Sequence, residues 1–212
     1  MDTSVFVVGT VTENRELVDG LYKVTIKLDD CKFTRPGQYA VVSIPGTDYE
    51  RAYTVCEYDG KRFSTVFLAN SDAAKALVAL ELGAEVDVET GLGNGFDVDA
   101  IPDGAILAAD TDGIPQMLCL LRELIMQGKR CSLVLGYSSK DRIFMVDSFS
   151  NLCNNIEILT QDGSNGRQGN AYDAIRNAEY VCAAGSVSML DNLSTRAKAG
   201  QFNLDGMNVT TW

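Results

Sequence analysis

Residues 38–68 read QYAVVSIPGTDYERAYTVCEYDGKRFSTVFL, and this stretch decides the first half of the fold. It holds three short runs rich in β-branched and aromatic residues, separated by Pro-Gly and Asp-Gly turns. Such runs are typical of antiparallel strands. The pattern extends outward in both directions, with VFVVGTV at 5–11, LYKVTIKL at 21–28 and EVDVET at 85–90. The sequence therefore predicts an antiparallel six-stranded β-barrel or sandwich.

One helix interrupts this series, because Ser71 and Asp72 offer an N-terminal cap before AAKALVALEL, which ends at Gly83. After residues 101–104 (IPDG) the pattern of apolar residues changes. The strand-like runs AILAA, CSLVLGY, IEILT, YVCAA and NVTTW alternate with the helical stretches IPQMLCLLRELIMQ, VDSFSNL, AYDAIR and VSMLDNLSTRAKA. This alternation predicts an α/β domain with a five-stranded parallel sheet. We expect two domains, residues 1–100 and 101–212.

Composition excludes several function classes. The chain of 212 residues has a net charge of −11, which argues against nucleic acid or an anionic membrane as partner. It has no histidine, which removes histidine-based catalysis and histidine-ligated zinc. The six cysteines form no CxxC pair, so buried free thiols are expected and no metal site. No leader or membrane span is evident, and we expect a cytoplasmic location.

The residues with the clearest chemistry are RPGQYAVVSIPG at 35–46 and RAYT at 51–54. On a strand, Arg51 and Tyr53 share one face. Arginine suits a diphosphate, tyrosine offers a flat ring face, and the hydroxyl of Thr54 can hydrogen-bond a ring nitrogen. An ordinary cross-strand Arg/Tyr pair is the alternative.

Three further stretches add to this signal: GLGNGF at 91–96, TQDGSNGRQG at 160–169 and AGSVSM at 184–189. Together with PGQY and RAYT they make the chain resemble the ferredoxin-NADP reductase superfamily of flavoproteins. Within this superfamily, these motifs are most similar to those of the electron-transfer subunits of class B dihydroorotate dehydrogenases. The first stretch alone could be a glycine turn joining two domains, and the second a surface loop at a carboxyl strand end.

The resemblance implies an FAD-binding barrel, NAD(P)H as the electron donor and a dehydrogenase subunit or a second copy of the chain as partner. The protein would orient these cofactors and need no catalytic side chain. The cofactor-binding positions that it implies are Arg51, Ala52, Tyr53, Thr54, Val66, Phe67, Leu68, Ala73, Ala74, Gly113, Ile114, Asp162, Gly163, Ser164, Ala184, Gly185 and Trp212.

The chain departs from the family pattern in several places. A glycine-rich loop is replaced by Ala108–Met117 (AADTDGIPQM), where two aspartates add charge that opposes an anionic ligand, although Asp112 could cap the next helix. Ala73 and Ala74 replace a G-x-G-T loop, and Ala184 replaces a cysteine. The cysteine-rich segment that binds a two-iron cluster is absent, so none is expected in this chain.

Three functions remain open from the residues. The first is an electron-transfer flavoprotein, in which Trp212 either stacks near the flavin or fills a domain interface. The second is a paralogue that keeps the fold, has lost or altered nucleotide binding, and acts as a regulatory or assembly subunit. The third is a reductase that releases free reduced flavin.

Overall fold

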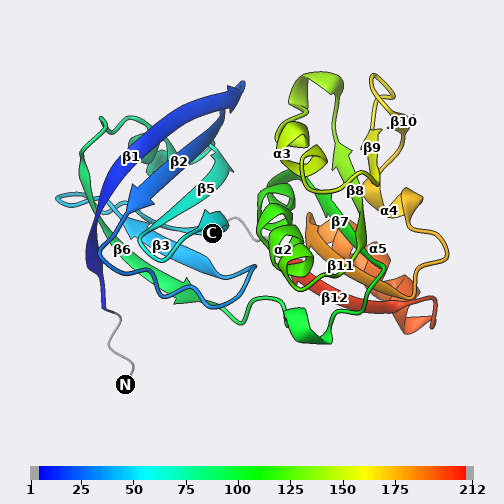
Figure 1. The fold of residues 1–212 in the computed structure, drawn as a ribbon. Helices are drawn as coiled ribbons and strands as arrows, with labels where there is room; N and C mark the ends of the chain where they lie inside the picture. Colours follow the sequence, from blue (N-terminus) through cyan, green and yellow to red (C-terminus); the bar gives the residue numbers. More distant parts are fainter. Residues whose placement is uncertain (1–4, 209–212) are drawn as a thin grey trace. The chain divides into compact units, whose positions relative to one another are not determined.

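The computed structural model describes residues 5–208, which form two compact units divided between Gly95 and Phe96 (Figure 1). Each unit has its own layers and its own buried core. The two units are therefore described separately.

The first unit is a closed antiparallel barrel with the strand order β1-β2-β5-β4-β3-β6, which confirms the predicted fold class. Its inward side chains come from alternate positions, as in β2, where Val24 and Ile26 are fully buried. The strands are β1 (Val7–Val18), β2 (Leu21–Lys27), β3 (Tyr39–Ser43), β4 (Glu50–Tyr58), β5 (Arg62–Leu68) and β6 (Glu85–Leu92).

One helix, α1 (Asp72–Val78), packs on this barrel and begins where the sequence predicts, after the cap Ser71. It ends before Gly83, the predicted end. The reason lies in the next turn, where Val11 accepts a hydrogen bond from the amide of Gly83 at 2.8 Å and donates one to Ala84 at 2.9 Å. These bonds attach the chain to β1, and Asn14 of the same strand donates from its side chain to the carbonyls of Val78 and Leu80 at 2.7 and 3.4 Å, which are acceptors that a longer helix would use.

The second unit is a parallel sheet with the order β10-β9-β8-β7-β11-β12. Five strands were predicted, and the additional strand is the two-residue β10. The last predicted strand, NVTTW at 208–212, lies outside the described residues except for Asn208, and the structure has a strand at 203–208 that pairs with β11. The strands are β7 (Ala105–Asp110), β8 (Cys131–Tyr137), β9 (Ile156–Thr160), β10 (Arg167–Gln168), β11 (Tyr180–Gly185) and β12 (Asn203–Asn208).

Helices cover both faces of this sheet (Figure 1). One buried cluster joins α2 and α3 to Leu107, Leu133 and Cys182, and another joins α4 and α5 to the opposite sheet face through Ala108 and Val181. The helices are α2 (Ile114–Met126), α3 (Val146–Ser150), α4 (Ala171–Ala174) and α5 (Val187–Lys198), with short 3₁₀ turns η1 (Val98–Ala100), η2 (Thr111–Gly113) and η3 (Lys140–Arg142).

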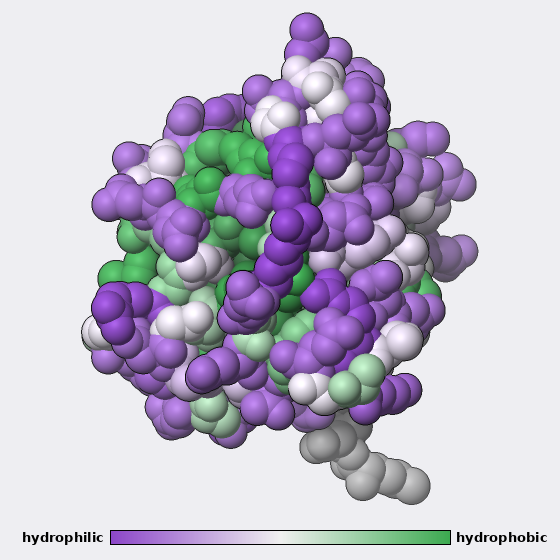
Figure 2. Space-filling model, turned by 90° about the vertical axis from the view of Figure 1, so that its right-hand side faces the viewer, coloured by the Kyte–Doolittle hydropathy of each residue, from purple (hydrophilic) through white to green (hydrophobic). Residues whose placement is uncertain are grey.

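Hydrophilic residues dominate the face drawn in Figure 2, and hydrophobic residues gather in one area of it. In the described part of the chain, no helix is both long and apolar enough to cross a lipid bilayer.

Candidate functional site

Arg51 and Tyr53 lie together on β4, on the shared face that strand alternation predicts. Their side chains are buried, with only 9% and 3% of their surface exposed. The guanidinium carbon of Arg51 lies 5.4 Å from the centroid of the Tyr53 ring, within the range of a cation–π contact. Ala52 and Thr54 are half-buried beside them. Neither Arg51 nor Tyr53 points into bulk water.

The guanidinium of Arg51 reaches the start of α1. Its Nη1 donates to the hydroxyl of Ser71 at 2.8 Å and to the side-chain oxygen of Asn70 at 3.4 Å. The same Ser71 hydroxyl accepts from the amide of Ala74 at 3.3 Å and so caps the helix. The Nε of Arg51 is buried and has no hydrogen-bond partner among the described residues. A positive charge with an unused donor is thus fixed beside a helix start.

Tyr53 presents an uncharged phenol at this position. Burial raises the pKa of Tyr53 to about 12, and the nearby Arg51 charge only partly offsets this effect. Its ring packs against that of Phe67, with the centroids 4.6 Å apart. Phe67 belongs to β5, where Val66 is also buried and Leu68 is half-buried. The rings of Tyr53 and Phe67 thus pack together next to the guanidinium of Arg51.

The two alanines that depart from the family pattern lie in the first turn of α1. Ala74 is fully buried in the barrel core, whereas Ala73 is half-buried and Asp72 is exposed. The methyl group of Ala74 therefore fills core space. Its presence has a packing reason that is independent of any ligand.

The PGQY and GLGNGF motifs are joined by one side chain. The Nε2 of Gln38 donates to the carbonyls of Gly91 and Gly93 at 3.0 and 3.1 Å. Its Oε1 accepts from the amides of Thr34 and Arg35 at 2.7 and 3.1 Å. Gly91 has a φ of +77° and lies so close to a backbone carbonyl that a side chain would overlap with it. These contacts make GLGNGF a glycine turn held by Gln38.

A carboxylate occupies the carboxyl edge of the second sheet. At the end of β7, Asp110 accepts from the amide of Ser186 at 2.6 Å and from its hydroxyl at 2.7 Å. Ser186 in turn caps α5 by accepting from the amide of Met189 at 3.3 Å. An arriving diphosphate would meet a negative group that already uses these donors. This edge therefore fits a dinucleotide poorly.

The turn after Asp110 leads into α2 at Ile114, which is buried. A side chain at Gly113 would overlap with the carbonyl of Ala184, so only glycine allows this close approach. The interpretation of Asp112 as the helix cap is wrong, because the N-cap residue of α2 is Gly113. Asp112 lies one residue earlier, within η2.

The loop after β9 holds the predicted residues Asp162, Gly163 and Ser164. Ser164 donates to the carboxylate of Asp162 from its amide at 2.9 Å and its hydroxyl at 2.6 Å. These bonds, the hydroxyl bond first, lower the pKa of Asp162. The hydroxyl of Ser164 also accepts from the amide of Lys140 at 2.7 Å. The loop is thus a preformed exposed turn at the carboxyl end of a strand.

Ala184 and Gly185 end β11 and are both buried. Cys182 lies on the same sheet face as Ala184, as period two predicts, since both belong to one core cluster. Burial raises the pKa of Cys182, which keeps it a thiol. Trp212 lies outside the described residues. Among residues 5–208, no group of three or more cysteines or carboxylates is arranged to hold a metal ion.

No family model matches the chain. The electron transfer subunit of dihydroorotate dehydrogenase B (NAD(+)) from Clostridium perfringens is 26% identical over 198 residues, covering 92% of this chain and 80% of that subunit. The subunit from Fusobacterium nucleatum is 29% identical, covering 80% of this chain and 68% of that subunit. The chain is similar to these electron transfer subunits. The resemblance found in the motifs is thereby confirmed.

Solved structures agree on the fold. A flavohemoglobin from Malassezia yamatoensis with bound FAD and heme superposes with a TM-score of 0.79 at 12% identity, covering 95% of this chain and 60% of that chain. The NADH-dependent reduced ferredoxin-NADP oxidoreductase superposes with a TM-score of 0.80 at 20% identity, covering 96% of this chain and 76% of that chain. The chain has a ferredoxin reductase-like fold.

Sequence reasoning did not identify the partners of these site residues. Asn70 lies beside Arg51, Gln38 joins two motifs, and Ser186 lies beside Asp110. These contacts join residues that are far apart in the sequence, so no local pattern predicts them. Two signals were available. Ser71, which Arg51 contacts, was readable as a helix cap, and Gln38 belongs to the PGQY motif.

Proposed function

We propose that this chain is an electron-transfer flavoprotein that binds FAD on its barrel unit and passes electrons to a partner protein. The observation that carries the proposal is the buried guanidinium of Arg51, whose Nε has no partner among the described residues. A buried hydrogen-bond donor without an acceptor lowers the stability of the folded state, and a bound ligand that supplies an acceptor would remove this cost. The similarity to electron transfer subunits supports the same conclusion.

The barrel residues fit the chemistry of FAD. Arg51 and Ser71 would hold the diphosphate, because a guanidinium binds phosphate oxygens in pairs. Tyr53 and Thr54 would orient the flavin ring, and Val66, Phe67 and Leu68 on the neighbouring strand would exclude water from it. When bound, FAD supplies the hydride and single-electron chemistry.

We further propose NAD(P)H as the donor and a dehydrogenase subunit as the partner, with a second copy of the chain as the alternative partner and the cytoplasm as the location. The proposed nucleotide positions on the second unit lie along the carboxyl edge of its sheet, where ligands of open α/β sheets bind. Asp110 opposes an anionic ligand there, so no reaction step is assigned to this edge. These positions are Gly113, Ile114, Asp162, Gly163, Ser164, Ala184 and Gly185.

Flavin binding tests the proposal directly. The purified full chain is incubated with FAD, desalted, and examined for the blue absorbance of bound flavin. We expect the wild type to retain flavin and Arg51→Ala to lose at least nine-tenths of it. The matched control is Arg62→Ala, which removes an exposed arginine paired with Asp59 on the same barrel. A wild type that stays colourless contradicts the proposal, as does equal flavin retention by both variants.

One observation favours a second function. At the carboxyl edge of the second sheet, hydrogen bonds from Ser186 satisfy the carboxylate of Asp110, and no nucleotide is needed for this. A paralogue that keeps the fold and serves as a regulatory or assembly subunit would have such an edge. A colourless wild type that neither binds FAD nor oxidises NAD(P)H, yet copurifies in a stoichiometric complex with a dehydrogenase, would support this function.

A further inference from the structure

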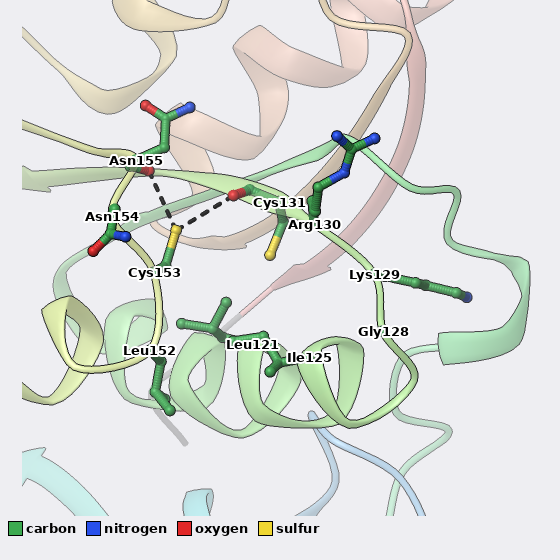
Figure 3. Close-up of a pocket in the computed structure, with 10 residues that line it drawn as sticks. All are labelled: Leu121, Ile125, Gly128, Lys129, Arg130, Cys131, Leu152, Cys153, Asn154 and Asn155. Atoms are coloured by element: carbon green, nitrogen blue, oxygen red, sulfur yellow. Dashed lines mark hydrogen bonds between the residues drawn. The ribbon is translucent and has the colours of Figure 1, made fainter.

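A groove of about 500 Å³ lies at the amino-terminal edge of the second sheet, at the strand ends opposite the proposed nucleotide positions (Figure 3). Leu121 and Ile125 of α2 and Leu152 after α3 form its apolar wall. Two cysteines also line it: Cys131, the first residue of β8, and Cys153, just before β9. The proposed function uses none of these residues.

The two cysteines lie on adjacent chain segments. The thiol of Cys153 donates to the carbonyl of Cys131 at 3.3 Å. Nearby, the amide of Leu133 donates to the carbonyl of Asn155 at 2.8 Å, which starts the pairing of β8 with β9. Neighbouring strands lie about 4.8 Å apart, and disulfides join Cα atoms about 4.4 to 6.8 Å apart. The hydrogen bond shows that the sulfur of Cys153 already lies beside the backbone of Cys131.

Both cysteines also pack against the same core cluster, the one that contains Leu121. In Figure 3 the sulfur of Cys131 points toward α2, and the sulfur of Cys153 points toward the carbonyls of Cys131 and Asn155. They are also the accessible thiols of the chain, because both are partly exposed while the other four cysteines are buried. A small oxidant can reach this pair first.

We propose that Cys131 and Cys153 form a reversible disulfide when the protein meets hydrogen peroxide. The Cys153 thiol loses its proton and its thiolate attacks one peroxide oxygen, so a sulfur–oxygen bond forms, the oxygen–oxygen bond breaks, and the hydroxide that leaves takes up that proton as water. The sulfur of Cys131 then attacks the sulfenic sulfur of Cys153, loses its proton and displaces hydroxide, which together make a second water. The two thiols give up two electrons, and one peroxide becomes two waters.

The order of attack follows from the surroundings of Cys131. Burial, with a smaller contribution from Cys153, raises the pKa of Cys131 to about 12. Its thiolate is therefore scarce at neutral pH. This suits Cys131 for the second step, the attack on the sulfenic acid of Cys153, and makes that step slow. The bridge would tie the start of β8 to the segment before β9 and stabilise the second unit by restricting its unfolded chain.

Peptide mapping of the full-length protein tests the bridge. The chain is treated with hydrogen peroxide, its remaining thiols are alkylated, and it is digested with trypsin. Cleavage after lysine and arginine puts the two cysteines on different peptides, residues 131–140 and 143–167. We expect one linked species that lacks two hydrogens relative to the separate peptides, and that dithiothreitol releases.

Two variants and a melting curve complete the test. Cys131→Ser and Cys153→Ser should each abolish the linked species, whereas Cys31→Ala, which removes a barrel cysteine, should retain it. Oxidation should raise the melting temperature of the wild type by about 5 to 10 °C and that of both serine variants by none. Complete alkylation of both wild-type cysteines after peroxide, or their conversion to sulfinic acid without a linked peptide, overturns the proposal. Neither outcome depends on whether the chain binds FAD.

Discussion

Replacing Asp110 should change stability and nucleotide affinity in opposite directions. Its carboxylate accepts two short hydrogen bonds from Ser186, at 2.6 Å from the amide and 2.7 Å from the hydroxyl. Hydrogen bonds to a charged group contribute about 1.5 to 3 kcal/mol each, and less where water competes. Because Asp110 is half-buried, we expect Asp110→Gly to lower the free energy of unfolding by about 2 to 3 kcal/mol. Asp110→Asn keeps the shape and should lose about 1 kcal/mol.

The effect on nucleotide binding follows from charge. Two like charges about 5 Å apart repel by about 1 kcal/mol in water and about 3 kcal/mol at an effective dielectric constant of 20. If NADH uses this edge, both variants should bind it roughly 5 to 150 times more tightly than the wild type.

Urea unfolding and isothermal titration with NADH measure the two effects on the same samples. The control is Asp191→Asn, which removes one exposed acidic charge from α5 and leaves the contacts of Ser186 intact. It should match the wild type in both assays. The reasoning is refuted if Asp110→Gly unfolds at the wild-type urea midpoint, or if neither Asp110 variant binds NADH more than twofold tighter than the control.

Three further predictions concern single residues. Gly113→Ala should destabilise the second unit by about 3 kcal/mol in urea unfolding, because the methyl would overlap with the carbonyl of Ala184, whereas Gly206→Ala has space and should change little. Tyr53 has a pKa of about 12 in the folded chain and about 10 when unfolded, so its contribution to stability is complete below pH 10 and is lost between pH 10 and 12. In an alkaline titration of tyrosine absorbance, Tyr53→Phe should lack this late step. Persistence of the step in the variant would refute the assignment. Gln38→Ala should lower the melting temperature by at least 5 °C, because Gln38 is 7% exposed and its bonds join two backbone segments, and an unchanged melting curve would contradict that role.

The barrel could be predicted because each of its strands can be recognised from its own short stretch of sequence. Each strand carries its own β-branched run and its own turn residues, and the period of two also places Arg51 and Tyr53 on one face. Two segments of the second sheet were not predicted as strands, for the opposite reason. Residues 167–168 are polar and exposed, and they become β10 only because the preceding loop turns back along β9. Residues 203–208 contain asparagine, aspartate and glycine, poor strand formers, and pairing with β11 overrides that preference.

The site was predictable to the level of residue type and face, and no further. The RAYT motif indicates an arginine and a tyrosine for a flavin, but the hydrogen bond from Arg51 to Ser71 joins residues that lie twenty positions apart. The contact between Asp110 and Ser186 joins residues that lie 76 positions apart. Such contacts depend on how strands and helices pack, which no short window of sequence records.

The departures from the family pattern differ in what they leave unsatisfied. Ala74 and Ala184 are fully buried in core clusters, and Asp110 satisfies its carboxylate with Ser186. In the second unit, hydrogen bonds from Ser186 satisfy Asp110, whereas the side-chain amide of Gln116 in α2 is buried without a partner among the described residues. In the barrel the Nε of Arg51 is likewise buried without a partner among the described residues, and it differs from Gln116 in carrying a positive charge. A protein that had lost all its ligands would gain stability by pairing or exposing that group. The barrel is therefore where a bound anion is expected first, and flavin retention is the measurement with which to begin.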